Sequence, residues 1–322
     1  MVVRDVLSSP MNTDSSAIAP QAPPLSTPAT AASPTALRGV LFGLLGVLSF
    51  SFTLPLTRFA VADLDPLLIG GGRAVVAAVL AIIVLAIVRP PRPRGRQWLR
   101  LAVVALGVVA GFSMLTSLAL QTVPAAHGAV VIGLLPVATA IAAVIRGGER
   151  PSLTFWVASS AGAVAVVTFV VITSGGFSGL HLADLLLLAA VAAAAIGYSE
   201  GAMLSRELGS WQTICWALIV GLPLTIPFAL GGLASGLPDA GPASWLAFAY
   251  LAVVSQFLGF FAWYRGLAIG PIARVSQTQL IQPVMSIIWA TLILGEQLDL
   301  LVWVGALVVL VCASLAVRAR IR

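Results

Sequence analysis

Two ionisable side chains stand inside long apolar stretches of this sequence, where they could bind a ligand or carry protons. Glu200 lies in "GYSEGAM", near the end of an apolar stretch that begins at Leu182. A partly buried carboxylate holds its proton more tightly than one in water, so Glu200 could face a cavity and exchange protons near neutral pH. Alternatively, it could reach water at the end of its segment or pair with Arg206.

Arg73 is the deeper of the two charges, because it stands seven residues after Pro66, where its segment begins. An unpaired cation is unfavourable there, so Arg73 should face protein or a water-filled cavity. It could hold the carboxylate of a substrate. It could also pair with Asp63 or Asp65 and lock that end of the protein.

A row of polar side chains is predicted in the apolar segment 271–294. Its members repeat at spacings of three and four residues and share one helical face: Ser276, Gln279, Pro283 and Ser286. Gln282 lies beside that face. Polar groups at mid-membrane need partners, so the row is either a cavity wall or a set of hydrogen bonds between helices.

Aromatic residues gather in the second half of the chain and could stack on an aromatic or aliphatic substrate. Core packing and anchoring at the membrane surface are the alternatives. The candidates are Tyr198, Trp216, Phe257, Phe260, Phe261, Trp263 and Tyr264. His127 and His181 have no partner at metal-ligand spacing, so we expect them at the membrane interface and expect no metal site.

The composition indicates a protein whose surface faces lipid. The 322 residues are 60% hydrophobic and 9% charged, with a mean hydropathy of +1.07, whereas a soluble domain is about 25% charged. All 17 basic residues are arginine, and the net charge is +6. These arginines are spread over short loops, so a nucleic-acid partner is not expected. Cys215 and Cys312 stand in apolar runs and are predicted to pack there without a disulfide.

Ten apolar segments are long enough to cross a membrane as helices, which need about 20 residues. They cover roughly 39–59, 66–88, 99–120, 124–145, 152–173, 182–204, 211–231, 243–264, 271–294 and 299–317. Residues 1–36 are rich in Pro, Ala, Ser and Thr and are predicted to form a disordered cytoplasmic tail. Most arginines fall at one set of segment ends, and the positive-inside rule therefore places both termini in the cytoplasm.

An internal repeat is visible at a shift of 147 residues, which aligns "LLPVATAIAAVIRGGERPSLTFWV" with "IQPVMSIIWATLILGEQLDLLVWV". The aligned pairs include Pro136 with Pro283, Glu149 with Glu296, and Trp156 with Trp303. Five helices per copy is an odd number, so the second copy enters the membrane from the opposite side, as in alternating-access transporters. Pro136 and Pro283 would free backbone carbonyl groups for a ligand or a hinge.

With these paired motifs, with "GRAVVAA" and with "FFAWYRGLAIGPIARVSQTQLIQPV", the sequence resembles EamA-type members of the drug/metabolite transporter (DMT) superfamily over residues 38–317. The resemblance implies an all-α integral membrane protein of ten transmembrane helices, in two inverted five-helix repeats, 37–173 and 182–317, with a cavity between them. It also implies a carrier of the bacterial inner membrane that exports amino acids or related small metabolites. The first segment reads "SFSFTLPLTR", where many members have an aromatic-Gly-Ser segment, so substrate identity does not carry over.

Other function classes fit the sequence less well. It has no HExxH, no Gly-rich phosphate loop and no Ser-centred elbow, so neither an enzyme nor a cofactor is expected. A scaffold would offer a larger domain outside the membrane. An importer or a passive facilitator stays open as an alternative to an exporter. The expected partners are the lipid bilayer, a small-molecule substrate and, if Glu200 couples transport, protons.

Overall fold

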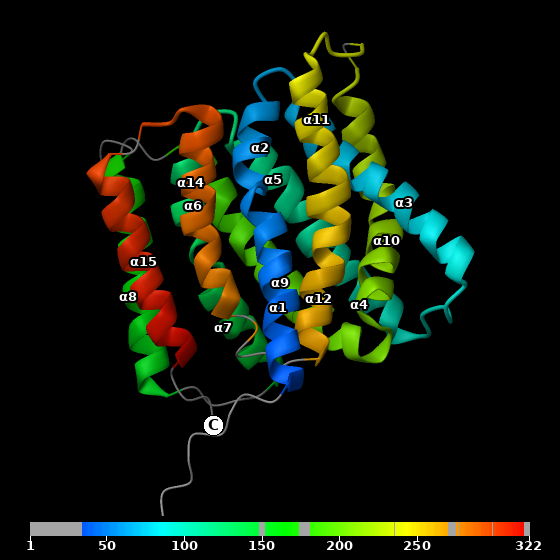
Figure 1. Cartoon of the computed structure of the whole chain (residues 1–322), viewed down its shortest axis with the longest axis horizontal. Helices are drawn as coiled ribbons and strands as arrows, with labels where there is room; N and C mark the ends of the chain where they lie inside the picture. Colours follow the sequence, from blue (N-terminus) through cyan, green and yellow to red (C-terminus); the bar gives the residue numbers. More distant parts are fainter. Residues whose placement is uncertain are drawn as a thin grey trace, which may run out of the picture. The chain divides into compact units, whose positions relative to one another are not determined.

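A computed structural model describes residues 34–147, 152–173, 181–234, 236–269, 275, 277–297 and 299–318. All regular elements of these ranges are helices, which confirms the predicted all-α class (Figure 1). The first helix begins at Pro34, so the last residues of the predicted tail, 34–36, are helical. Proline fits the first turn of a helix because its missing N–H would have no partner there.

Six helical stretches are long and apolar enough to cross a membrane. They are Leu37–Ala60, Leu68–Val88, Arg96–Ala119, Leu182–Glu207, Ser210–Gly231 and Pro242–Ile269. Shorter apolar helices occupy the positions of the remaining predicted spans: Ala125–Thr139, Trp156–Phe169, Thr278–Leu294 and Leu300–Cys312. The prediction of apolar spanning helices is thus confirmed for six segments, and the count of ten stays a prediction.

The elements are α-helices with three π-helical stretches and one 3₁₀ helix among the described residues. In the first half they are α1 (Pro34–Ser51), α2 (Thr53–Ala60), η1 (Leu68–Gly72), α3 (Arg73–Val88), α4 (Arg96–Val104), η2 (Ala105–Gly111), α5 (Phe112–Ala119), α6 (Ala125–Ile132), α7 (Leu135–Gly147) and α8 (Leu153–Thr173). In the second half they are α9 (Leu182–Glu207), α10 (Ser210–Gly231), α11 (Pro242–Tyr250), η4 (Leu251–Leu258), α12 (Gly259–Ile269), η5 (Gln277–Ile281), α14 (Gln282–Leu294) and α15 (Leu300–Arg318).

Three of the six long spans contain a π-helical stretch, namely η1, η2 and η4. A π turn holds more residues than an α turn, so it turns the following side chains toward a different face. Such stretches occur mostly as short bulges, often at functional sites. In this chain they interrupt the second, third and eighth predicted spans.

The predicted helices over 124–145 and 271–294 are not continuous, which corrects the sequence interpretation. Helix α6 ends at Ile132 and α7 begins at Leu135. In the other segment, the 3₁₀ helix η5 precedes α14. Pro136 and Pro283 each stand at the second residue of a new helix, where proline breaks no hydrogen bond. They therefore begin helices and do not kink them, and the predicted polar face does not follow one regular helix.

Helix α9 lies at the centre of the packing and contacts α4, α5, α6, α7, α10 and α12. Around it, α1 packs on α12, α3 on α10, α6 on α14, and α8 on α15 (Figure 1). Neighbouring helices approach α9 closely at Gly197 and Gly201. A Cβ at Gly197 would meet a Val108 side-chain carbon at 2.8 Å, and a Cβ at Gly201 would meet the Tyr264 hydroxyl at 2.1 Å.

Candidate substrate cavity

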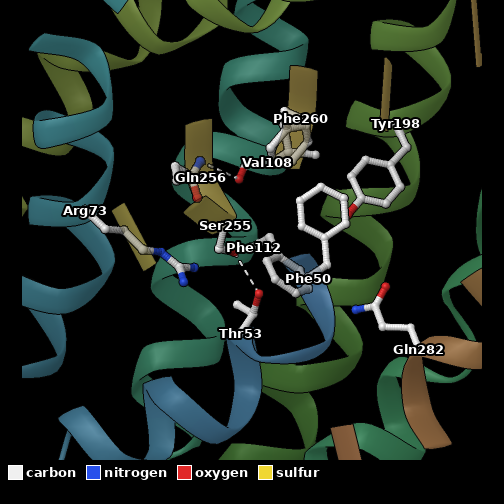
Figure 2. A pocket seen from close by; sticks show the side chains of 10 residues that line it. All are labelled: Phe50, Thr53, Arg73, Val108, Phe112, Tyr198, Ser255, Gln256, Phe260 and Gln282. Carbon is white, nitrogen blue, oxygen red and sulfur yellow. Dashed lines mark hydrogen bonds between the residues drawn. The ribbon is translucent and has the colours of Figure 1, made fainter. Parts of the chain in front are cut away.

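A small cavity lies where α1, α2, α3, α5, α9, α12 and α14 meet the π stretches η2 and η4. It is lined by Phe50, Thr53, Arg73, Val108, Phe112, Tyr198, Ser255, Gln256, Phe260 and Gln282 (Figure 2). The volume open to the centre of a water molecule is about 20 Å³. One water needs about 10–15 Å³ by this measure. This conformation therefore has room for one or two waters at the cavity and no room for a whole amino acid.

Breaks in the helices bring the polar side chains to this cavity. Arg73 is the first residue after η1, and Ser255 and Gln256 lie within η4. Thr53 begins α2 after the break at residue 52, and Gln282 begins α14. Because residues at helix ends and π turns leave the regular spacing, their side chains converge on a point that no unbroken helix face would reach.

Arg73 is buried deep in the protein. Its side chain is among the largest fully buried ones, and the residue is 1% exposed. None of the three guanidinium nitrogens, Nε, Nη1 and Nη2, has a hydrogen-bond partner among the described residues. Figure 2 shows the side chain extending toward Thr53 and Ser255. A buried charge without a partner is strongly unfavourable, so the Arg73 guanidinium is a candidate group for binding an anionic ligand.

The alternative reading, in which Arg73 pairs with Asp63 or Asp65, is wrong. Asp63 Oδ2 accepts a hydrogen bond from the Ser244 hydroxyl at 2.5 Å. Asp65 Oδ1 accepts one from the backbone N–H of Leu67 at 2.7 Å, which caps the turn leading into η1. Both carboxylates therefore bind groups close to their own end of the protein, and Arg73 points away into the cavity.

The neutral polar groups of the lining largely satisfy one another. The hydroxyls of Thr53 and Ser255 lie 2.7 Å apart. The Gln256 amide accepts from the Ser113 hydroxyl at 3.1 Å and donates to the carbonyl of Val108 at 3.4 Å. These bonds fix the lining in place and leave Arg73 as the group in greatest need of a partner.

An aromatic wall closes the other side of the cavity. The Phe50 ring centre lies 4.9 Å from that of Phe260 and 6.5 Å from that of Tyr198. Trp263 lies behind this wall, 5.8 Å from Tyr198, and Tyr264 lies 5.5 Å from Phe260. Aromatic faces offer apolar contact area and favour stacked or edge-on partners.

Glu200 lies outside this cavity, in an ion pair between α9 and α4. It is 1% exposed, and it accepts a hydrogen bond from Arg100 Nε. Arg100 Nη1 also donates to Glu207 Oε1 at 2.5 Å, and Gln97 reaches the other oxygen of Glu207 at 3.2 Å. Glu200 therefore pairs with Arg100, a partner that was not among the alternatives considered from the sequence.

Sequence reasoning missed this partner although a signal existed. Glu200 and Glu207 are seven residues apart, which puts them two turns apart on one helix face. A single arginine at the start of a neighbouring span can serve both. Arg100 stands at that position, near the start of α4.

A second carboxylate joins the two halves of the chain at another place. Glu296 follows the end of α14, and its two oxygens accept the backbone N–H groups of Ala125 and Ala126 at 2.8 and 3.0 Å. These N–H groups open α6, where the helix dipole and the free donors favour a negative charge.

His127 is buried among the helices. It is 8% exposed, and its Nε2 lies 2.8 Å from Asp184 Oδ1. The other oxygen of Asp184 accepts the backbone N–H of His181 at 3.1 Å and so helps to begin α9. The histidine therefore joins α6 to α9 inside the protein.

The remaining predicted site residues lie near the cavity or away from it. Gln279 is 2% exposed, and neither its amide oxygen nor its amide nitrogen has a partner among the described residues, but it is not part of the lining. Ser276 lies outside the described residues. Of the residues singled out in the sequence, the cavity brings together Arg73, Tyr198, Phe260 and Gln282. It adds the polar side chains of Thr53, Ser255 and Gln256, which carried no pattern that marked them.

Known proteins match most of this chain. The chain matches the model of the EamA-like transporter family over residues 37–172 and 181–318. It is 45% identical over 280 residues to the uncharacterized transporter YdeK of Bacillus subtilis strain 168, covering 87% of this chain and 97% of the relative. It is 26% identical over 273 residues to the uncharacterized inner membrane transporter YedA of Escherichia coli strain K12, covering 84% of this chain and 86% of the relative.

The name of another relative states a class of substrate. The chain is 25% identical over 223 residues to a probable terminal-alkyne amino-acid exporter of Streptantibioticus cattleyicolor, covering 67% of this chain and 73% of the relative. A solved crystal structure aligns with a TM-score of 0.60 at 20% identity, over 87% of this chain and 96% of that chain. At this identity the crystal structure supports the fold alone.

We expect Arg100→Met to destabilise the detergent-solubilised protein more than Glu207→Gln. Removing Arg100 breaks an ion pair with a carboxylate that is 1% exposed, and loss of one partner from a buried pair costs about 3–5 kcal/mol. Glu207 is 42% exposed, and exposed pairs contribute about 1 kcal/mol or less. The measurement is thermal unfolding followed by tryptophan fluorescence. Adding Glu200→Gln to Arg100→Met should restore part of the loss, and equal losses in the two single variants would contradict the assignment.

Proposed function

The chain belongs to the EamA-like transporter family and is a multi-pass membrane transporter, and from this premise we propose that it exports amino acids or related small metabolites by alternating access. The observation that carries the proposal is the cavity around Arg73, which holds a buried unpaired charge among broken helices. Transporter sites are typically built at such breaks, near the interface of two structural repeats. The name of the distant exporter relative supports the amino-acid class.

The inverted repeat of two five-helix units, 37–173 and 182–317, is part of this proposal. The breaks before Pro136 and Pro283 stand at aligned positions of the two sequence copies. The two broken segments also pack on each other through α6 and α14. Apolar helices occupy the positions of all the predicted spans, which is consistent with ten crossings. Both termini would then lie in the cytoplasm, in a bacterial inner membrane, by the positive-inside rule.

Two polar contacts are suited to act as gates on opposite sides of the cavity. The third span runs from Arg96 to Ala119 and lines the cavity with Val108 and Phe112. Arg100 lies near the start of this span, about 12 Å before Val108 at ~1.5 Å per residue. Ala125 follows the other end of this span, and its backbone N–H donates a hydrogen bond to Glu296. Opening one contact while the other stays closed would expose the cavity to one side of the membrane at a time.

Proton coupling is proposed at the gate formed by Glu200. Protonation removes the charge that holds Arg100, so α4 and α9 would be free to separate. Glu207, which is more exposed, would compete with Glu200 for Arg100 and keep the guanidinium near the protein surface. Binding of a proton by this carboxylate would therefore favour opening, since the neutral carboxyl group no longer forms an ion pair.

Export is tested by comparing metabolites in culture medium and cell extract. Cells carry an empty vector, the wild type, or Glu200→Gln at matched expression. We expect one class of small metabolites to rise in the medium only when the transporter is present. A rise inside the cell would identify an importer and contradict the proposed direction, and no change in either pool would count against transport of cell metabolites.

The proposed coupling predicts that Glu200→Gln flattens the pH dependence of transport. Glutamine keeps the shape of the side chain and can still accept a hydrogen bond from Arg100, but it cannot titrate. The wild-type rate should rise as the pH falls on the side of this gate, whereas the variant should transport at a similar rate across the range. The rates are measured in proteoliposomes with the pH set on each side. A pH profile equal to that of the wild type would remove Glu200 from the coupling mechanism.

A further inference from the structure

The charge balance of the cavity restricts what can bind there. Its lining holds one cation, Arg73, and no Asp or Glu among the described residues. The guanidinium is 1% exposed and has no partner among those residues. A ligand that completes this site must bring the negative charge itself, because burying a charge without a counter-ion is strongly unfavourable.

The geometry of the guanidinium favours a carboxylate. Its planar fork of N–H donors matches two carboxylate oxygens, and such charge-assisted pairs are stronger than neutral hydrogen bonds. All three of its nitrogens are available. Gln282, on the opposite side of the cavity, can add an uncharged donor (Figure 2).

The rest of the lining is apolar or already hydrogen-bonded. The rings of Phe50, Phe112 and Phe260 offer contact to an apolar or aromatic body. The hydroxyls of Thr53 and Ser255 bind each other. A ligand ammonium would find no carboxylate in this lining and would stand in the same cavity as the Arg73 charge. A second carboxylate on the ligand would find no second cation.

We propose that the Arg73 cavity binds organic monocarboxylates with an apolar or aromatic body, and prefers them to the zwitterionic amino acid of the same shape. This inference rests on the proposed function, since it names the substrate class of the same transport site. The space beside Arg73 has room for a carboxylate group in this conformation, and the body enters as the aromatic wall moves during opening. The substrate charge thus replaces the missing protein partner of Arg73.

Three ligands that share a phenylethyl body test this preference on the purified full-length protein in chloride-free buffer. They are 3-phenylpropanoate (anion), phenylalanine (zwitterion) and phenethylamine (cation). Binding is measured by isothermal titration calorimetry and by the shift in thermal unfolding. We expect 3-phenylpropanoate to bind at least about tenfold more tightly than phenylalanine, because the phenylalanine ammonium would be buried near Arg73 without a counter-ion. Phenethylamine should not bind, because it has no carboxylate to form the charge-assisted pair.

Arg73→Met should weaken the binding of 3-phenylpropanoate by at least about tenfold, since it keeps the length of the side chain without the charge. Arg89→Met is the matched control, because it removes an exposed arginine from the end of the same helix. Arg73→Lys keeps the charge and should retain the preference for the anion with lower affinity. The ligand series on the wild type decides the proposal even if a variant fails to fold.

Several results would overturn the inference. They are phenylalanine binding as tightly as 3-phenylpropanoate, no binding of 3-phenylpropanoate, or unchanged binding in Arg73→Met. Chloride that stabilises the protein and excludes the organic anion would identify a site for inorganic anions only. Counterflow of labelled 3-phenylpropanoate in proteoliposomes separates the two proposals. Binding without transport would contradict the proposed function and leave the binding site, whereas export of amino acids without binding of this anion would contradict the substrate class alone.

Discussion

The unpaired charge of Arg73 is the constraint on which the candidate site depends. An arginine inside an apolar helical protein is normally held by an acid, a set of carbonyl groups or water. Here the nearby acids Asp63 and Asp65 bind other groups, and the guanidinium has no protein partner among the described residues. An anionic ligand that enters the cavity would stabilise this guanidinium. The cavity is therefore suited to bind an anion and to release it.

The broken helices are the structural means by which this charge is placed. The π stretches η1, η2 and η4 and the helix starts at Thr53 and Gln282 turn side chains toward one point. Small residues make the breaks possible. A Cβ at Gly71 would lie 2.7 Å from the backbone nitrogen of Ala229, so η1 packs against α10 at backbone distance directly before Arg73. The same irregular turns that weaken regular helix bonding also allow the helices to move.

The sequence predicted the helical class, the six long spans among its ten segments, and the burial of Arg73, because these follow from apolar length and from the cost of charge in lipid. It left open whether Glu200 is buried or reaches water. It did not predict the lining by Thr53, Ser255 and Gln256, since neither the helix break before Thr53 nor the π stretch that holds Ser255 and Gln256 was evident from the sequence. It placed Pro136 and Pro283 inside continuous helices, whereas each proline stands at the start of a new helix, because proline fits the first turn of a helix. The partners Arg100 and Asp184 were missed because pairing between distant spans needs the packing of the helices.

A diffraction experiment with 3-(4-bromophenyl)propanoate tests the central claim most directly, since bromine is located by its anomalous signal. The account predicts a bromine peak among the rings of Phe50, Phe112 and Phe260, with the carboxylate of the ligand on the guanidinium of Arg73. A peak elsewhere in the protein would contradict it, as would an acidic side chain of the protein bonded to Arg73. In either case the buried charge would have a role other than binding the transported anion.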